Sequence, residues 1–213
     1  MWGTGKHEPG RDSHLTELYQ IERCRDCPNA VLDMQAMERA CDRFLKEIDY
    51  TGKQLARLGQ GKPNYHDIFR IAIAGCPNSC SQPQIKDFGL QGQAVPEVGQ
   101  GCNRCGLCVA ACPDGGILLG EEGPQIDPSL CLNCGKCAGC CATGAITIGK
   151  KGYRVSRGGK LGRRPRLAQE VSSLTDEQGA LQWLRLTVAL LQKEGRPGER
   201  LGTLLERIEK NKK

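Results

Sequence analysis

The chain has 213 residues, including 14 cysteines, with 4% aromatic residues and a formal net charge of +6. This length allows one or two compact domains, and no apolar run is long enough to cross a membrane or to act as a signal peptide. We therefore expect a cytoplasmic, reducing location without membrane association, where cysteines are ligands rather than disulfide partners. Because ligand cysteines are negatively charged thiolates, the formal charge does not indicate nucleic-acid binding.

The first predicted elements frame two pairs of cysteines. Residues 1–14 are polar and predict a loose N-terminal arm. An apolar stripe at helical spacing predicts a helix over residues 29–48, and alternating apolar residues predict a strand over residues 68–74. One cysteine pair precedes the helix and the other follows the strand. These cysteines are Cys24, Cys27, Cys76 and Cys80.

A second strand, expected over residues 85–90, leads to eight regularly spaced cysteines. They form two runs of C-x2-C-x2-C-x3-C, the spacing of bacterial ferredoxins, in which three thiolates bind one [4Fe–4S] cluster and the fourth binds the other. One predicted ligand set is Cys102, Cys105, Cys108 and Cys141. The other is Cys131, Cys134, Cys137 and Cys112. Residues 99–149 are thus predicted to form a two-cluster ferredoxin domain.

Two other uses of these cysteines fit the spacing less well. Structural zinc prefers paired ligands and needs no third cysteine two residues further on. Disulfides need an oxidising compartment, and the adjacent Cys140 and Cys141 suit them poorly. Cys140 is interpreted as a bystander thiol. The two earlier pairs could complete a third [4Fe–4S] site if the fold brings them together, or they could bind zinc separately.

The segment after the cysteine runs is basic. It contains eight Lys or Arg residues and no acidic residue between Lys150 and Arg166, which indicates either an anion-binding site or a solvated loop. A short strand is expected over residues 153–155. Two helices then close the chain, the first beginning at a capping box, Thr175 to Gln178, and ending at Gly195.

Several segments together resemble the siroheme-dependent sulfite and nitrite reductases. They are GCPNSC at 75–80, IKDFGLQG at 85–92, CPNA at 27–30, GYRV at 152–155, GGKLG at 158–162 and GERLG at 198–202. The match covers about residues 22–205 and is interrupted by the ferredoxin unit. An insertion at this point is similar to that in dissimilatory and anaerobic sulfite reductase subunits.

The resemblance implies an α+β fold, with a partial reductase domain at residues 15–98 and 150–213 around the inserted ferredoxin domain. It also implies a [4Fe–4S] cluster held by Cys27, Cys76 and Cys80, with Cys80 shared with the siroheme iron. Cys24 departs from the family spacing and is a further candidate ligand. Residues expected to bind siroheme carboxylates are Arg154, Arg157, Lys160, Arg163 and Arg164, and the first three are also candidates for catalysis.

The motifs that carry the resemblance do not include the family's upstream half, which is expected to supply much of the siroheme cradle. The leading hypothesis is an iron–sulfur oxidoreductase that passes electrons from two ferredoxin clusters to a [4Fe–4S]–siroheme centre and reduces sulfite or nitrite. The alternative is a non-catalytic electron-transfer protein or subunit that lacks siroheme. Expected partners are a redox protein, a small anion such as sulfite, and a second subunit or second copy of the chain.

Overall fold

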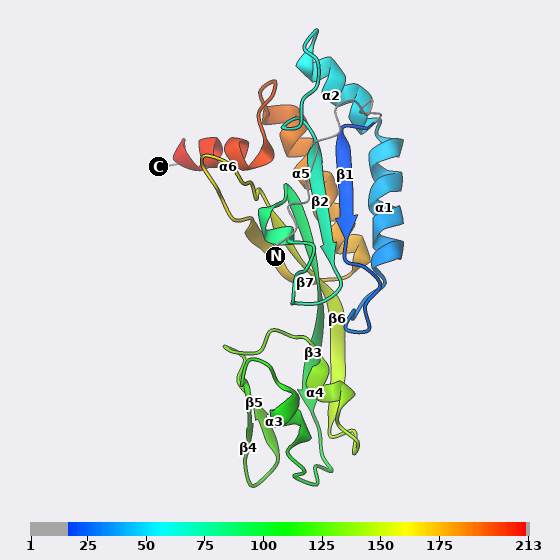
Figure 1. The fold of residues 1–213 in the computed structure, drawn as a ribbon, viewed down its shortest axis with the longest axis vertical. Helices are drawn as coiled ribbons and strands as arrows, with labels where there is room; N and C mark the ends of the chain where they lie inside the picture. The colour runs from blue at the N-terminus through cyan, green and yellow to red at the C-terminus, as the bar shows by residue number, and fades with distance from the viewer. Residues whose placement is uncertain (1–16, 212–213) are drawn as a thin grey trace, which may run out of the picture.

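The computed structural model describes residues 17–211, which form two lobes along the long axis of the molecule (Figure 1). The larger lobe contains a five-stranded sheet with helices, and the smaller lobe contains the two cysteine runs. The predicted α+β class is confirmed. The predicted arm at residues 1–14 lies outside the described residues. Within residues 17–211, no helix has both the length and the apolar character needed to cross a bilayer.

The main sheet combines parallel and antiparallel strands. Its members are β1 (Tyr19–Arg23), β2 (Phe69–Ala74), β3 (Phe88–Val98), β6 (Ile146–Arg157) and β7 (Gln169–Thr175). They lie in the order β1-β2-β3-β6-β7. The first three strands are parallel, and β6 and β7 continue the sheet antiparallel. On β2, the middle strand of the three parallel ones, Ile71 lies beside Ile21 of β1 and Phe88 of β3.

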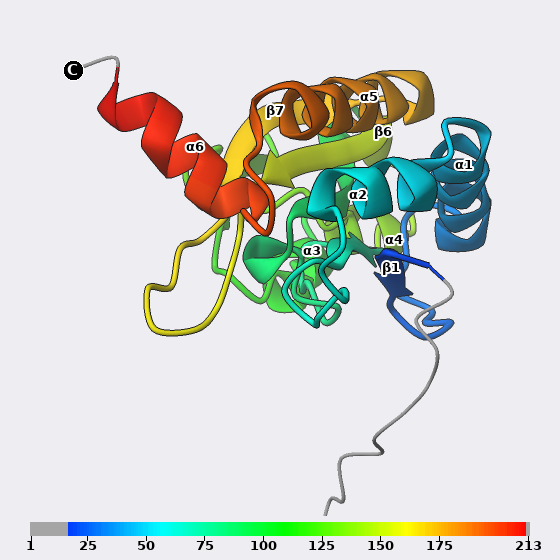
Figure 2. The same ribbon diagram turned by 90° about the horizontal axis from the view of Figure 1, so that it is seen from above.

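Two of the four long helices cover one face of the sheet. The four are α1 (Met34–Glu47), α2 (Tyr50–Leu58), α5 (Glu177–Glu194) and α6 (Leu201–Lys210). α1 packs against β1 and β2, and α5 packs against β3, β6 and β7. Seen from above in Figure 2, α5 runs along the side of β6. The helices bury the apolar stripe that the sequence predicted, including Met37, Cys41 and Leu45, against Ile71 and Leu90.

A short 3-10 turn, η1 (Pro83–Ile85), covers the opposite face of the sheet. Phe88 and Leu90 point into the helix-covered core, so Gly89 between them faces the other way. A β-carbon on Gly89 would lie 2.5 Å from the Pro83 carbonyl oxygen. Glycine is therefore needed for η1 to lie flat on β3.

Several predicted boundaries differ from the structure. The helix expected from residue 29 begins at Met34, after Asp33 caps it by accepting a hydrogen bond from the Ala36 N–H at 2.9 Å. α5 is capped by Asp176 rather than by the expected Thr175, which ends β7. The strand expected over residues 85–90 begins only at Phe88, as the start of the longer β3, and the strand expected over residues 153–155 is part of the longer β6. β1 and β7 were not predicted.

The cysteine-rich lobe is inserted between β3 and β6. Val98 at the end of β3 pairs with Ile146 at the start of β6, so residues 99–145 leave and re-enter the sheet at neighbouring points. The lobe contains α3 (Leu107–Ala111), β4 (Ile117–Leu119), β5 (Pro124–Ile126) and α4 (Lys136–Gly139). Its small core consists of Cys108, Ile117, Cys137 and Ile146. Half of these residues are predicted cluster ligands, so bound clusters would form part of this core.

Candidate metal centre

Two parallel strands bring the first two cysteine pairs to one edge of the sheet. β1 ends just before Cys24, β2 ends just before the second pair, and the carboxyl ends of parallel neighbours lie side by side. The Cys24 N–H donates to the Ile73 carbonyl at 3.1 Å, and the Val31 N–H donates to the Gly75 carbonyl at 2.8 Å. Hydrogen bonds therefore join both ends of the 24–31 loop to the end of β2.

Gly75 is the point of closest packing beside these cysteines. A β-carbon there would lie 2.7 Å from the Met34 sulfur and 2.9 Å from the Ala30 β-carbon. On the neighbouring strand, a β-carbon on Gly92 would lie 2.5 Å from the Gly75 carbonyl oxygen. Only glycine at both positions lets the strand, the turn and the loop approach this closely. Backbone packing thus sets where the cysteines lie.

One cavity of about 780 Å³ gathers both pairs. Its wall includes Cys24, Cys27, Cys76 and Cys80, which we call the junction set. Cys27 and Cys80 are exposed, whereas the other two are half-buried. The departure in spacing therefore does not take Cys24 away from the other three. Four soft thiolates around one cavity suit an iron–sulfur cluster better than two separate zinc sites.

Hydrogen-bond donors around the junction set favour thiolates. Burial raises the pKa of the Cys24 thiol, but backbone and hydroxyl donors of the neighbouring turn outweigh it, so this pKa lies below its ordinary value. The Asn78 side-chain amide donates to the Cys80 sulfur at 3.0 Å, and that of Asn29 donates to the Cys27 sulfur at 3.8 Å. The thiolate form is the one that binds iron.

Two smaller cavities in the insertion are each walled by one predicted cysteine set. The first is lined by Cys102, Cys105, Cys108 and Cys141, the distal set. The second is lined by Cys112, Cys131, Cys134 and Cys137, the middle set. The fold thus brings the last cysteine of each run to the other run, as a two-cluster ferredoxin requires. Within residues 17–211, no three His, Cys, Asp or Glu side chains form a group that could hold a single metal ion.

Backbone N–H groups also point at sulfur atoms in the insertion. Arg104 donates to Cys102 at 3.3 Å, and Ile146 donates to Cys141 at 3.4 Å. The pKa of Cys141 is accordingly lowered, first by the Ile146 N–H and then by the hydroxyl of a neighbouring threonine. Burial acts in the opposite direction on Cys137 and raises its pKa to about 11. Metal binding must therefore provide the free energy that deprotonates this thiol.

Cys134 connects the insertion with the junction set. It lies in the wall of both the middle cavity and the junction cavity. Its loop is tied to β3, because the Ala94 N–H donates to the Asn133 carbonyl at 2.7 Å and Ala94 forms a parallel bridge with Cys134. One strand of the larger lobe thus fixes a ligand loop of the smaller lobe beside the junction cavity.

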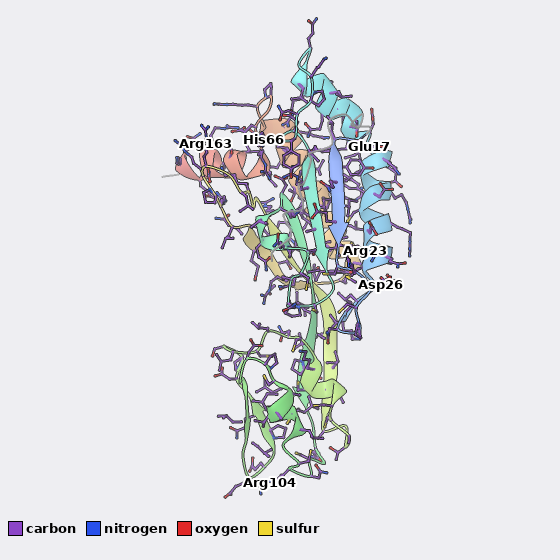
Figure 3. The ribbon with its side chains drawn as sticks, in the orientation of Figure 1. Glu17, Arg23, Asp26, His66, Arg104 and Arg163 are labelled. Carbon is purple, nitrogen blue, oxygen red and sulfur yellow. The ribbon has the colours of Figure 1, made fainter. Side chains whose placement is uncertain are left out.

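The three cysteine sets are ordered along the molecule. In Figure 3, Arg23 and Asp26, which flank Cys24, are labelled where the two lobes meet, and Arg104 is labelled at the far tip of the insertion. Arg104 belongs to the loop of the distal set. The middle set shares its wall with the junction cavity, so it lies between the other two.

Comparison with known proteins identifies the family. A family model for the nitrite and sulphite reductase 4Fe-4S domain matches residues 23–212. The chain belongs to this family. The resemblance read from the motifs at 75–80 and 85–92 is thereby confirmed, and the chain is an iron–sulfur protein of the sulfite and nitrite reductase family.

The similar proteins include sulfite reductases that are much longer than this chain. The coenzyme F420-dependent sulfite reductase of Methanocaldococcus jannaschii is 49% identical over 45 residues, which are 21% of this chain and 7% of that protein. Dissimilatory sulfite reductase I has a similar fold, with a TM-score of 0.60 and 18% identity over 90% of this chain and 50% of that one. NirA of Mycobacterium tuberculosis gives a TM-score of 0.49 and 16% identity over 88% of this chain and 25% of that one.

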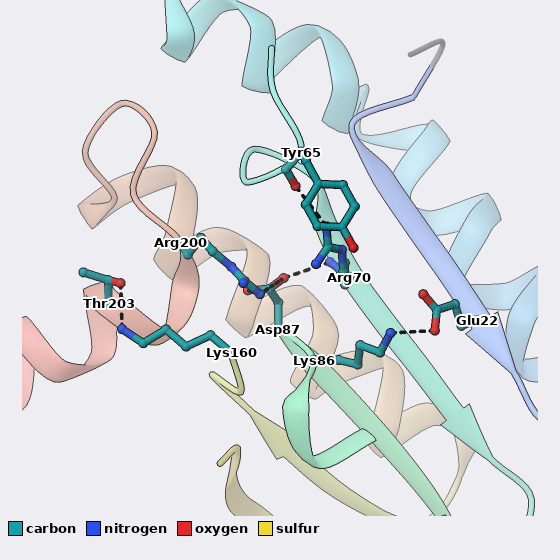
Figure 4. A network of polar contacts seen from close by, with 8 residues as sticks. All are labelled: Glu22, Tyr65, Arg70, Lys86, Asp87, Lys160, Arg200 and Thr203. Atoms are coloured by element: carbon teal, nitrogen blue, oxygen red, sulfur yellow. Dashed lines mark hydrogen bonds and ion pairs between the residues drawn. The ribbon is translucent and has the colours of Figure 1, made fainter. Parts of the chain in front are cut away.

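In this reductase-family chain, the basic residues expected to bind siroheme carboxylates do not line the junction cavity. Arg154 forms an ion pair with Glu170 at 3.2 Å. Lys160 has a side chain that is only 9% exposed, and its ammonium lies 3.1 Å from Glu206. The same ammonium lies 3.0 Å from the Thr203 hydroxyl, as Figure 4 shows. Both cations are thus neutralised within the fold, and their roles at a cofactor stay a prediction.

The other three basic candidates also lie elsewhere. Arg157 is half-buried, with its guanidinium 5.8 Å from the centre of the Trp183 ring, and desolvation lowers its pKa. Arg163 and Arg164 are exposed on the loop between β6 and β7. Figure 3 shows Arg163 far from Arg23 at the junction. This loop therefore does not contribute to the wall of the four-cysteine cavity.

The cations that do line the junction cavity were missed by sequence reasoning. They are Arg23, Arg25 and Lys136. Arg23 is engaged by Asp26 at 3.1 Å and by Glu38 at 2.8 Å. Arg25 and Lys136 form no ion pair with other residues of the described range. The available signal was position, since Arg25 and Lys136 each lie between two cysteines of one ligand motif and Arg23 immediately precedes Cys24.

Proposed function

We propose that this chain is an electron-transferring iron–sulfur component of a sulfite or nitrite reductase and carries three [4Fe–4S] clusters. The distal, middle and junction sets each provide four thiolates, the ligand number that a cubane cluster needs. The observation that carries the proposal is the shared wall at Cys134, which puts the middle set beside the junction set. Electrons would enter at the distal set and pass through the middle set to the junction set.

The junction cavity also suits Cys80 as the thiolate shared with siroheme. Cys80 is exposed on the wall of a cavity whose volume is in the range of cofactor pockets. Siroheme would supply an iron at which sulfite takes up six electrons and six protons to give sulfide and three waters. The chain's own contribution would be to position Cys80 and to deliver electrons to it.

The carboxylates of siroheme are not matched by this chain alone. Only Arg25 and Lys136 are unpaired cations on the cavity wall within the described residues, and Arg23 is already engaged by two carboxylates. Desolvated carboxylates need cationic or hydrogen-bonding partners. We therefore propose that a second subunit, or a second copy of the chain, completes the siroheme site.

A second candidate function is electron transfer without siroheme. It is favoured by the position of the basic segment, because Arg154 and Lys160 are paired with Glu170 and Glu206 instead of facing the cavity. In that case the junction cluster would pass electrons to a partner protein rather than to a haem.

The test is purification without oxygen from a siroheme-producing host, followed by iron and sulfide analysis and a visible spectrum. We expect about twelve cluster irons per chain, and about eight in Cys80→Ser with the ferredoxin-type signals intact. Cys140→Ser is the control, because this thiol lines none of the three cysteine cavities. Tetrapyrrole bands that vanish in Cys80→Ser support the siroheme site.

The other results discriminate between the candidates. Three clusters without tetrapyrrole, even with the other subunit present, favour the carrier. About eight irons in the wild type would contradict the junction cluster, and loss of all cluster signals in Cys80→Ser would contradict the separation into independent sites.

A further inference from the structure

The turn between Cys76 and Cys80 is held from behind by a side chain of β3. The Gln91 amide nitrogen donates to the Pro77 carbonyl at 3.1 Å and to the Ser79 hydroxyl. Neither contact involves a cysteine, and Gln91 does not line the junction cavity. The glutamine therefore contacts the backbone that carries the ligands rather than the ligands themselves.

The orientation of this amide is fixed by its partners. A carbonyl oxygen can only accept a hydrogen bond, so the nitrogen of Gln91 must face Pro77 and its oxygen must face away. That oxygen accepts from the Gln93 amide nitrogen at 2.8 Å. Gln93 is fully buried, and its own amide oxygen has no hydrogen-bond partner within the described residues. An unsatisfied buried oxygen costs stability, and the hydrogen bond that Gln93 donates to Gln91 offsets part of this cost.

The turn needs external support because of its backbone. Ser79 has φ of +56°, in the left-handed region that non-glycine residues rarely adopt, and is buried. Strained residues persist where the surroundings over-determine them, often at functional sites. Here Ser79 donates through its hydroxyl to the Pro77 carbonyl at 3.2 Å, while Gln91 holds both groups.

The same strand also holds the middle set. Ala94 bridges the Asn133–Cys134 segment, three residues along β3 from Gln91. At about 3.3 Å per residue, these two attachment points lie roughly 10 Å apart along the strand. β3 thus fixes the junction turn and the middle ligand loop on one rigid element.

We propose that Gln91, supported by Gln93, is a positioning residue for the junction cluster. It sets the orientation of Cys76 and Cys80, and through β3 their spacing from Cys134. The inference rests on the proposed function only in requiring a cluster at the junction set. Loss of Gln91 alters the geometry around that one cluster and leaves the other two unchanged.

The experiment compares the anaerobically purified wild type with Gln91→Leu, which removes the donor while nearly preserving side-chain volume. Redox titration followed by electron paramagnetic resonance measures each cluster, with the insertion clusters as an internal reference. We expect a shifted potential and altered resonance of the junction cluster alone. We also expect about ten- to hundredfold faster iron loss from it to a chelator, the effect of losing the two hydrogen bonds that Gln91 donates to the turn. The control is Gln169→Leu, an exposed glutamine on β7.

A double variant tests the mechanism. Ser79→Gly relieves the strain of the positive φ and also removes one of the two groups that Gln91 contacts, so the turn should depend less on Gln91. We expect Gln91→Leu to have a smaller effect on iron loss in the Ser79→Gly background than in the wild type.

Two outcomes would overturn the inference: an unchanged junction cluster in Gln91→Leu, or equal changes in all three clusters. A wild type with only about eight irons is a distinct result, because it refutes the proposed function and removes the site that Gln91 would position.

Discussion

Two opposing effects act on the pKa of the Cys24 thiol. Partial burial disfavours the thiolate, but donors from the turn that carries Cys76 and Cys80 stabilise it, and the pKa is lowered overall. Cys41 shows the opposite result, since it lies in the core beside Met37 and burial raises its pKa to about 12. The environment thus separates a candidate ligand from a structural cysteine of the same chain.

The corresponding prediction is that Cys24→Ser loses the junction cluster. The hydroxyl of serine is a poor iron ligand, so the iron content should fall from about twelve to about eight per chain. Iron and acid-labile sulfide analysis measures this, with Cys140→Ser as the control. Retention of about twelve irons in Cys24→Ser would mean that three cysteines suffice and that the departure in spacing marks a non-ligand.

The sequence predicted which cysteines belong together, but it did not predict which basic residues line the junction cavity. Short spacings such as C-x2-C-x2-C constrain sulfur atoms to one loop whatever the rest of the fold does. Charges carry no such constraint. Lys160 is paired with Glu206 at 3.1 Å, 46 residues further along the chain, and no local pattern indicates that pairing. Three of the eight basic residues in this segment, Arg154, Lys160 and Arg166, form ion pairs within the fold, and the sequence pattern did not predict these pairs.

At the scale of elements, β3 is the strand that organises the site. The sequence predicted a strand that ends at residue 90, yet β3 continues through Gly92 and Pro96 to Val98. Gly92 is required for close approach to Gly75, not for a turn. Pro96 coincides with a shift of register between β3 and β6. Tertiary packing, which local composition does not encode, decided both positions.

Gly92→Ala tests this explanation of β3. The added β-carbon would lie 2.5 Å from the Gly75 carbonyl oxygen and should push the Cys76 turn away, costing about 1–3 kcal/mol and weakening the junction cluster. Urea unfolding and iron content measure the two effects. Gly99→Ala is a matched control, since its β-carbon would have no neighbour closer than 3.8 Å. Equal behaviour of the two variants would contradict the packing argument.

At the scale of the whole molecule, the insertion is placed where the sheet can accommodate it. Residues 99–145 replace a turn between two antiparallel strands, whose ends at Val98 and Ile146 are already paired. An insertion at such a point leaves the sheet intact. It also carries the middle set back to Ala94, so that the cysteine sets of the two lobes lie beside each other.

The order of the three sets predicts the route of electrons. Glu122 is exposed and adjoins Gly123, whose β-carbon would lie 3.5 Å from that of Cys102, so Glu122 is close to the distal set. A ruthenium photosensitiser attached at Glu122→Cys should reduce the distal cluster first and the junction cluster last. Time-resolved absorbance measures the order in which the clusters are reduced. In a Cys134→Ser background the middle cluster is lost, and the junction cluster should be reduced no faster than by free sensitiser.

The same label at Gln60→Cys, on the exposed loop after α2, controls for direct transfer. If the loss of the middle cluster left the rate unchanged, electrons would have to reach the junction set by another path, and the shared wall at Cys134 would not be the connection.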